Sequence, residues 1–178
     1  MPRLFTAIEI PHEIALSLTA LRGGIQGARW IDPENYHITL RFIGDVDEDV
    51  ADEVAEILQR VRRKPFSLTL TGIDVFGGKK PHSLWAGVSD GSELSALQSE
   101  HERLLQRIGL PPEHRKFTPH VTVARLRGVP GSAVAGYMSN RGLFRTAPFP
   151  VDRFVLYSSR ASQGGGPYIV EEAYDLVW

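Results

Sequence analysis

The chain has 178 residues, 42% of them hydrophobic and 23% charged, a balance typical of a soluble globular domain. Lys and Arg number 20 and Asp and Glu 21, so the net charge of −1 argues against a protein that binds long nucleic acids through their phosphate backbone. The absence of Cys excludes disulfides and thiolate metal sites. There is neither a signal-peptide pattern nor a run of roughly 18 apolar residues, so we expect a cytoplasmic protein without a membrane span.

Alternation of apolar and polar residues predicts strands, and apolar residues at helical spacing predict helices. In chain order the sequence predicts a strand at 3–10, a helix at 11–25, a strand at 36–43, a helix at 47–62, strands at 66–71 and 84–88, a helix at 92–108, and strands at 119–126, 154–158 and 169–176. Asp47 and Ser92 are expected to cap the second and third helices. Residues 128–149 are expected to form a loop, and Gly164-Gly165-Gly166 a flexible link.

The order of these elements predicts an α+β fold, and one short pattern occurs twice within it. His37-Ile38-Thr39-Leu40 and His120-Val121-Thr122-Val123 each lie in a predicted strand that follows a helix. We therefore expect residues 1–178 to form a single bilobal domain, in which each of two similar lobes contributes one His-x-Thr-x strand.

Each of these segments places a histidine and a threonine on one face of a strand, because residues i and i+2 share a face. If the two strands lie side by side, the imidazoles of His37 and His120 converge on one cleft. The hydroxyls of Thr39 and Thr122 then lie beside them and can donate hydrogen bonds to phosphate oxygens. Since His titrates near neutral pH, one ring can take a proton from attacking water while the other protonates the leaving sugar oxygen. Such a site needs no metal or cofactor if cations offset the developing charge.

Two arginines are candidates for this cation. Arg41 shares the face of His37 by regular alternation, which makes it the better candidate by pattern alone. Arg125 lies five positions after His120 and falls on the opposite face, unless that strand twists or bulges. For both residues the ordinary alternative is a solvated surface arginine.

The other histidines fit structural positions better than catalytic ones. His101 lies on the apolar stripe of its helix and is expected in the core or at its boundary, whereas His12 starts a helix and is expected to be exposed. His82 and His114 lie beside loop prolines, and loop position alone is a weak indication of function. Together with Lys79 and Lys80, His82 can form a basic loop near the substrate, or simply a solvated turn.

Further segments accompany the two His motifs along nearly the whole chain. They are Arg3–Ile8, Trp30–Asn35 leading into His37–Gly44, Phe117–Arg125, and Leu156–Ser159 with the later Tyr168. Together these segments resemble the two-histidine phosphoesterase superfamily and, within it, the RNA 2′,3′-cyclic phosphodiesterases, historically called 2′-5′ RNA ligases.

This resemblance implies two lobes of antiparallel β-sheet, with helices packed outside and the active site in a central cleft. It implies hydrolysis of the 2′,3′-cyclic phosphate at an RNA end to a 2′-phosphate, and the reverse 2′-5′ ligation of tRNA halves. His37 would then be the proton donor and His120 the proton acceptor. Thr39 and Thr122 would hold the phosphate.

Other residues are candidates for contact with the substrate. Beyond the two His-Thr pairs, these are Arg41, Arg125, Ser159 and Tyr168, the last two because they match family positions. Aromatic side chains can also stack on a terminal base, and the candidates are Phe42, Phe76 and Tyr168. Regular alternation turns Phe42 toward the core, so we expect a structural role for it.

Three alternatives stand beside this interpretation. The same chemistry can act on small cyclic nucleotides, or the protein can bind RNA or nucleotides without catalysis, although both His-Thr pairs are present. A metallohydrolase needs further ligands near the motifs, where Asp45 and Asp47 are better explained by a turn and a helix cap. The expected partners are RNA ends or small nucleotides, and we expect a monomer.

Overall fold

The computed structural model describes residues 1–159 and 166–177 and arranges them around a nine-stranded antiparallel sheet. The strand bounds agree with most of the predicted ranges to within a few residues. The strands are β1 (Arg3–Glu9), β2 (Ala28–Trp30), β3 (His37–Asp45), β4 (Phe66–Phe76), β5 (Ser83–Ser89), β6 (His120–Leu126), β7 (Phe149–Val151), β8 (Arg153–Ser159) and β9 (Tyr168–Asp175).

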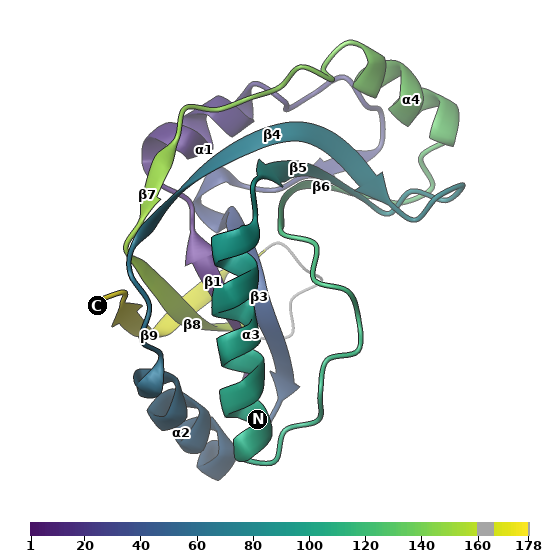
Figure 1. Ribbon diagram of the computed structural model, residues 1–178. Helices are drawn as coiled ribbons and strands as arrows, with labels where there is room; N and C mark the ends of the chain where they lie inside the picture. The colour runs from purple at the N-terminus through teal and green to yellow at the C-terminus, as the bar shows by residue number, and fades with distance from the viewer. Residues whose placement is uncertain (160–165, 178) are drawn as a thin grey trace.

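Helices cover the outside of this sheet. Figure 1 shows α3 running alongside β3, with α2 beside the lower end of α3. In the same view α1 and α4 lie at the top of the molecule. In the described part of the chain, no helix has the length and apolar character needed to cross a membrane. The helices are α1 (His12–Thr19), α2 (Glu48–Ile57), α3 (Ser92–Arg107) and α4 (Gly131–Ser139), with single 3-10 turns η1 (Pro33–Asn35) and η2 (Leu58–Arg60).

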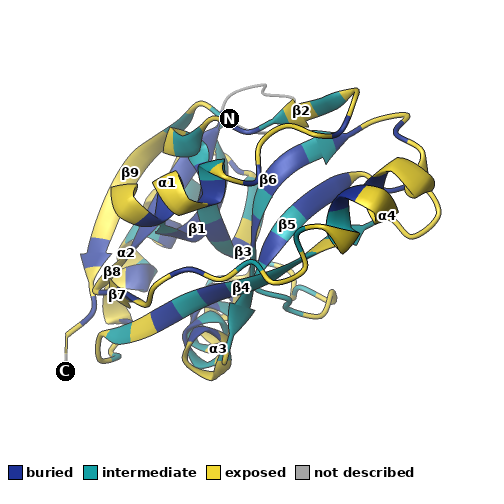
Figure 2. Ribbon diagram, turned by 90° about the horizontal axis from the view of Figure 1, so that it is seen from above, coloured by how far each residue is buried: buried dark blue, intermediate teal, exposed yellow. Residues whose placement is uncertain are grey.

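The sheet has two halves, which pair with each other between β3 and β6. One half has the order β7-β4-β5-β6 and the other β3-β1-β8-β9, and β2 pairs alongside β6. Among the described residues, β3 and β6 are joined by the single antiparallel pair Ile38–Val121. Figure 2 shows the halves as two arms, β4, β5 and β6 on one side and β1, β8 and β9 on the other. The predicted α+β fold, with antiparallel halves and helices outside, is confirmed.

The two faces of the sheet are buried differently. The main hydrophobic core lies between the sheet and the helices and includes Leu4 and Ile8 of β1. The intervening residues Phe5 and Ala7 belong to a separate small cluster on the other face. On the core side, the hydroxyl of Thr6 lies 3.0 Å from Nδ1 of the fully buried His101 in α3. The predicted core position of His101 is therefore confirmed.

A bulge in β3 changes the face on which Arg41 lies. In the ladder with β1, Thr39 pairs with Ala7 but Arg41 pairs with the next residue back, Thr6, so β3 contains one extra residue at this point. A bulge of this kind reverses the alternation that follows it. The prediction that Arg41 shares the face of His37 is therefore wrong, as is the prediction that Phe42 faces the core, since Phe42 is 45% exposed.

Arg41 is instead part of a buried ion pair with α3. Its Nε donates to Oε2 of Glu102 at 2.6 Å, and the exposed fractions of the two side chains are 6% and 17%. Its Nη2 also donates to the carbonyl of Pro111, while Glu102 accepts a hydrogen bond from the backbone N–H of Glu113. Arg41 and Glu102 thereby hold residues 111–113, at the start of the segment that leads to β6, against α3.

The predicted loop at 128–149 contains regular structure that the composition did not reveal. It contains α4 and the start of β7, and Val134 and Tyr137 of α4 are buried in the core. The Gly and Ser content of α4 hides its helical pattern, since two buried residues give a weak periodic signal. β2 was likewise not predicted, because three residues are too short to show alternation.

Of the two predicted helix caps, one is confirmed and one is wrong. Asp47 caps α2 as predicted, since its carboxylate accepts from the N–H of Val50 at 3.0 Å. Ser92 does not cap α3: Gly91 occupies the cap position and Ser92 is the first helical residue. Of the predicted glycine link, Gly164 and Gly165 lie outside the described residues.

We expect Arg41→Gln to lower the free energy of unfolding by about 3–5 kcal/mol, because it leaves the Glu102 carboxylate largely buried without its cation. Urea denaturation followed by circular dichroism measures this change. Arg115→Gln is the control: Arg115 is 80% exposed in its pair with Glu113, and its loss should cost less than about 1 kcal/mol. Equal, small losses in both variants would contradict a stabilising role for the buried pair.

Candidate active site

The pairing of β3 with β6 brings the two His-x-Thr-x segments side by side. Ile38 and Val121 are the paired residues, and both are fully buried in the core. Their neighbours along each strand point to the other face. Because the strands are antiparallel, His37 lies across from Thr122, and Thr39 across from His120. We call these two segments, residues 37–39 and 120–122, the seam.

Each seam histidine is held in the same way by the backbone two residues before it. Nδ1 of His37 lies 2.9 Å from the carbonyl oxygen of Asn35, and Nδ1 of His120 lies 2.6 Å from that of Thr118. A carbonyl oxygen only accepts hydrogen bonds, so Nδ1 carries the proton in both rings. Nε2 is then the atom of each ring that can accept or release a proton.

Thr39 already contacts this atom in His37. Its hydroxyl lies 3.1 Å from Nε2, and it donates to that nitrogen when the ring is neutral. An anion bound at the seam can accept the hydrogen bond of this hydroxyl in place of Nε2. Nε2 is then free to be protonated. The contact therefore links the protonation of His37 to the occupancy of the seam.

The surroundings of both histidines disfavour the charged ring. Burial lowers the pKa of His37 to about 4, and the hydrogen bond to the Asn35 carbonyl opposes this shift. The positive charges of His120 and Arg125 lower the pKa further. Burial also lowers the pKa of His120, again with a contribution from Arg125. Both rings are therefore neutral at neutral pH in the unliganded protein, and a bound anion favours protonation of one of them.

Arg125 supplies a positive charge at the seam because β6 bulges. In the ladder with β5, Thr122 pairs with Trp85 but Ala124 pairs with the adjacent Leu84, so Val123 is an extra residue. The bulge brings Arg125 back to the face of His120. Its Nε is buried without a hydrogen-bond partner among the described residues. Of the two candidate arginines, the structure places Arg125 at the seam and Arg41 against α3.

Aromatic rings flank each histidine. The His37 ring lies 5.2 Å from Phe5, 6.0 Å from Tyr157 and 5.0 Å from Tyr168, measured between centroids. On the other side, the His120 ring lies 4.9 Å from Phe76 and 5.4 Å from Trp85. These rings pack against the two imidazoles on the face of the sheet that carries the seam.

Three of these aromatic residues were not among the predicted site residues: Phe5, Tyr157 and Trp85. Each lies in an apolar strand, where an aromatic side chain is ordinarily assigned to the core. Alternation along β1 was the available signal, because it separates Phe5 from the core residues on either side. Without knowing which strands neighbour β3 and β6, that signal could not be connected to the histidines.

The remaining sequence candidates lie around the seam or away from it. His82 stacks on Phe76, with a centroid distance of 6.3 Å, at the turn between β4 and β5 where Lys79 and Lys80 are exposed. Ser159 pairs with Tyr168 in the sheet but lines a separate cavity of about 820 Å³ near α2. The structure thus brings Tyr168 to His37 and assigns Ser159 to another part of the surface.

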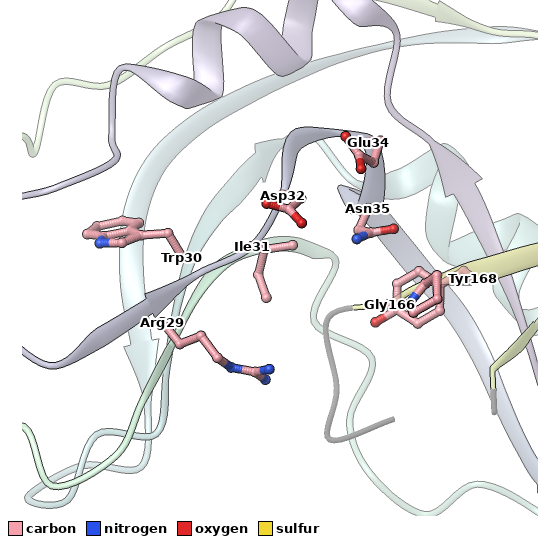
Figure 3. A pocket seen from close by; sticks show the side chains of 9 residues that line it. Arg29, Trp30, Ile31, Asp32, Glu34, Asn35, Gly166 and Tyr168 are labelled. Carbon is pink, nitrogen blue, oxygen red and sulfur yellow. The ribbon is translucent and has the colours of Figure 1, made fainter. Parts of the chain in front are cut away.

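A cavity of about 570 Å³ borders the seam on the His37 side. Figure 3 shows its lining, with Asn35 and Tyr168 on one side and Arg29 on the other. Asn35 and Tyr168 also contact His37, so the cavity and the seam share a wall.

The acidic residues near the first motif have structural partners. Asp45 pairs with Arg3 at 3.1 Å, and Asp47 caps α2. In residues 1–159 and 166–177, no three His, Asp or Glu side chains are grouped as metal ligands would be.

Comparison with known proteins connects this architecture to a family. The family model described as LigT like Phosphoesterase matches residues 8–85 and 87–168, each containing one His-x-Thr-x segment. A protein of Aeropyrum pernix named RNA 2′,3′-cyclic phosphodiesterase is 44% identical over 100 residues, which are 55% of this chain and 57% of that protein. A protein of the same name from Aquifex aeolicus is 36% identical over 155 residues, covering 82% of this chain and 81% of its own.

A solved structure agrees with these relatives. The crystal structure of E. coli LigT complexed with 3′-AMP matches with a TM-score of 0.76 and 25% identity, covering 100% of both chains. The two-armed sheet with one His-Thr pair from each half is thus that of a phosphoesterase. The chain belongs to the LigT-like phosphoesterase family, as its motifs predicted.

We expect inorganic phosphate to raise the pKa of His37 from about 4 toward neutrality, because an anion at the seam stabilises the protonated ring. NMR titration of the ring Cε1–H signals, with and without phosphate, measures this change. Since the complex then holds more protons than the free protein, phosphate should bind more tightly as the pH falls between the two pKa values.

His101 provides an internal control for this titration. Burial between α3 and the sheet lowers its pKa to about 3, and its position on the core side of the sheet means that phosphate should not change it. If saturating phosphate left the pKa values of both His37 and His120 unchanged, the anion would not bind at the seam.

Proposed function

We propose that this protein hydrolyses the 2′,3′-cyclic phosphodiester at an RNA end to a 2′-phosphomonoester, with His37 as proton donor and His120 as proton acceptor. The pairing of Ile38 with Val121 carries the proposal, because it sets both His-Thr pairs on one face of the sheet. The names of the relatives in Aeropyrum pernix and Aquifex aeolicus support the substrate. The nucleotide bound by E. coli LigT supports recognition of a nucleoside phosphate.

The reaction needs one proton to be taken and another to be given. Water attacks phosphorus while Nε2 of His120 accepts its proton, and the bond from phosphorus to O3′ breaks. Nε2 of protonated His37 gives its proton to O3′, which leaves a 3′-hydroxyl and a 2′-phosphate. His37 ends neutral and His120 protonated, and proton exchange with solvent restores the starting state.

Fixed donors around the seam offset the charge that builds up on the phosphate oxygens. The hydroxyls of Thr39 and Thr122 donate hydrogen bonds to these oxygens, and the guanidinium of Arg125 supplies a positive charge. This arrangement supports a mechanism that does not depend on a metal. With the 5′-hydroxyl of a second RNA in place of water, the same two histidines would form a 2′-5′ bond.

The first test is hydrolysis of a nucleoside 2′,3′-cyclic monophosphate in the presence of EDTA, with separation of the 2′- and 3′-phosphate products. We expect turnover to the 2′-phosphate. Loss of turnover in EDTA, restored by a divalent metal, would contradict the metal-independent mechanism. A protein that turns over neither this substrate nor a short RNA with a cyclic end would be a binding protein or act on another phosphodiester.

The roles of the seam residues are tested by separate substitutions. His37→Ala and His120→Ala should each lower kcat by about 10²- to 10⁴-fold, the usual contribution of a general acid or base. Thr39→Ala and Thr122→Ala should raise the barrier by about 1–3 kcal/mol, the worth of one hydrogen bond to developing charge. His12→Ala, at an exposed helix start, is the matched control and should keep full activity. Normal turnover in either seam histidine variant would remove that residue from the mechanism.

A further inference from the structure

The cavity beside the seam has the size and lining of a ligand site. Its volume of about 570 Å³ lies within the range of small-molecule pockets. Arg29 of β2 lies on one side, and Asp32, Glu34 and Asn35 of the η1 segment line another. Tyr168 closes the wall toward the seam. In Figure 3 the Arg29 side chain extends toward the middle of the cavity, whereas Trp30 points away from it.

This cavity is continuous with the site of the proposed reaction. The carbonyl of Asn35 holds Nδ1 of His37, and the Tyr168 ring lies 5.0 Å from the His37 ring. Both residues also line the cavity. Since His37 would protonate the leaving O3′, the terminal nucleoside would lie on the His37 side of the phosphate, which is also the side of the cavity.

Two arginines lie directly opposite each other where the cavity meets the seam. Arg29 of β2 pairs in register with Arg125 of β6, and residues in register point to the same face of a sheet. A ligand phosphate beside this pair would accept charge-assisted hydrogen bonds from guanidinium groups. Neighbouring strands lie about 4.8 Å apart, so the backbones of the two arginines are about one strand spacing apart.

We propose that this cavity binds the nucleotide that precedes the cyclic end of an RNA, with Arg29 on the phosphate that connects the two nucleotides. The carboxylates of Asp32 and Glu34 accept hydrogen bonds from the sugar hydroxyls or base amino groups of that preceding nucleotide. This inference rests on the proposed function, and it assigns the site to RNA ends in preference to small cyclic nucleotides.

The experiment compares three substrates: adenosine 2′,3′-cyclic phosphate, the same compound with a 5′-phosphate, and the dinucleotide ApA with a terminal 2′,3′-cyclic phosphate. We expect kcat/KM to be about tenfold or more higher for the dinucleotide than for the mononucleoside, the usual worth of a charge-assisted hydrogen bond. The 5′-phosphorylated compound should fall between them. Arg29→Gln should bring the dinucleotide-to-mononucleoside ratio close to one, whereas Arg103→Gln, an equal change of charge on the exposed face of α3, should leave the ratio as in the wild type.

Two results would overturn the inference. One is equal kcat/KM for dinucleotide and mononucleoside in the wild-type protein, and the other is an unchanged ratio in Arg29→Gln. If no substrate is turned over, the proposed function fails separately. Calorimetric binding of adenosine 2′-phosphate and of ApA with a terminal 2′-phosphate then decides the inference. Tighter binding of the dinucleotide that Arg29→Gln removes supports it, and equal binding of the two ligands overturns it.

Discussion

The contact between Ile38 and Val121 is the constraint on which the rest of the site depends. Among residues 1–159 and 166–177, the two halves of the sheet are paired through these two residues, and both side chains are fully buried. Because alternation is strict at this point, burying the apolar pair forces the flanking His and Thr residues onto the other face. The apolar contact that joins the halves of the molecule is therefore also what positions the two histidines, although neither paired residue has any chemistry of its own.

Electrostatics then determines the protonation state of the two histidines. Aromatic rings and the strand backbone bury both imidazoles, and Arg125 adds a positive charge, so the unliganded protein keeps both rings neutral. We expect a bound phosphate to reverse that preference for one ring. In the proposed mechanism the same anion is both the substrate and the charge that favours the protonated acid, so acid catalysis would be confined to the occupied state.

The sequence was sufficient for the features that depend on local alternation. The shared faces of His37 with Thr39 and of His120 with Thr122 follow from period two, as does the α+β fold. The arginines could not be assigned in the same way, because one extra residue in β3 and one in β6 reverse the alternation just beyond each motif. A bulge is defined by the partner strand, and the partner of each strand was unknown. The aromatic residue Phe5 was missed for the same reason.

The way in which the histidines are held has a consequence for how the protein tolerates change. Nδ1 of each ring is held by a main-chain carbonyl, at Asn35 and at Thr118. Every amino acid carries that carbonyl, so replacing either side chain leaves the hydrogen-bond acceptor in place. The ring tautomer is therefore encoded in the path of the backbone and not in the identity of a neighbouring residue. Substitutions that shift this path by a fraction of a hydrogen-bond length should impair the site more than substitutions that change the chemistry of positions 35 and 118.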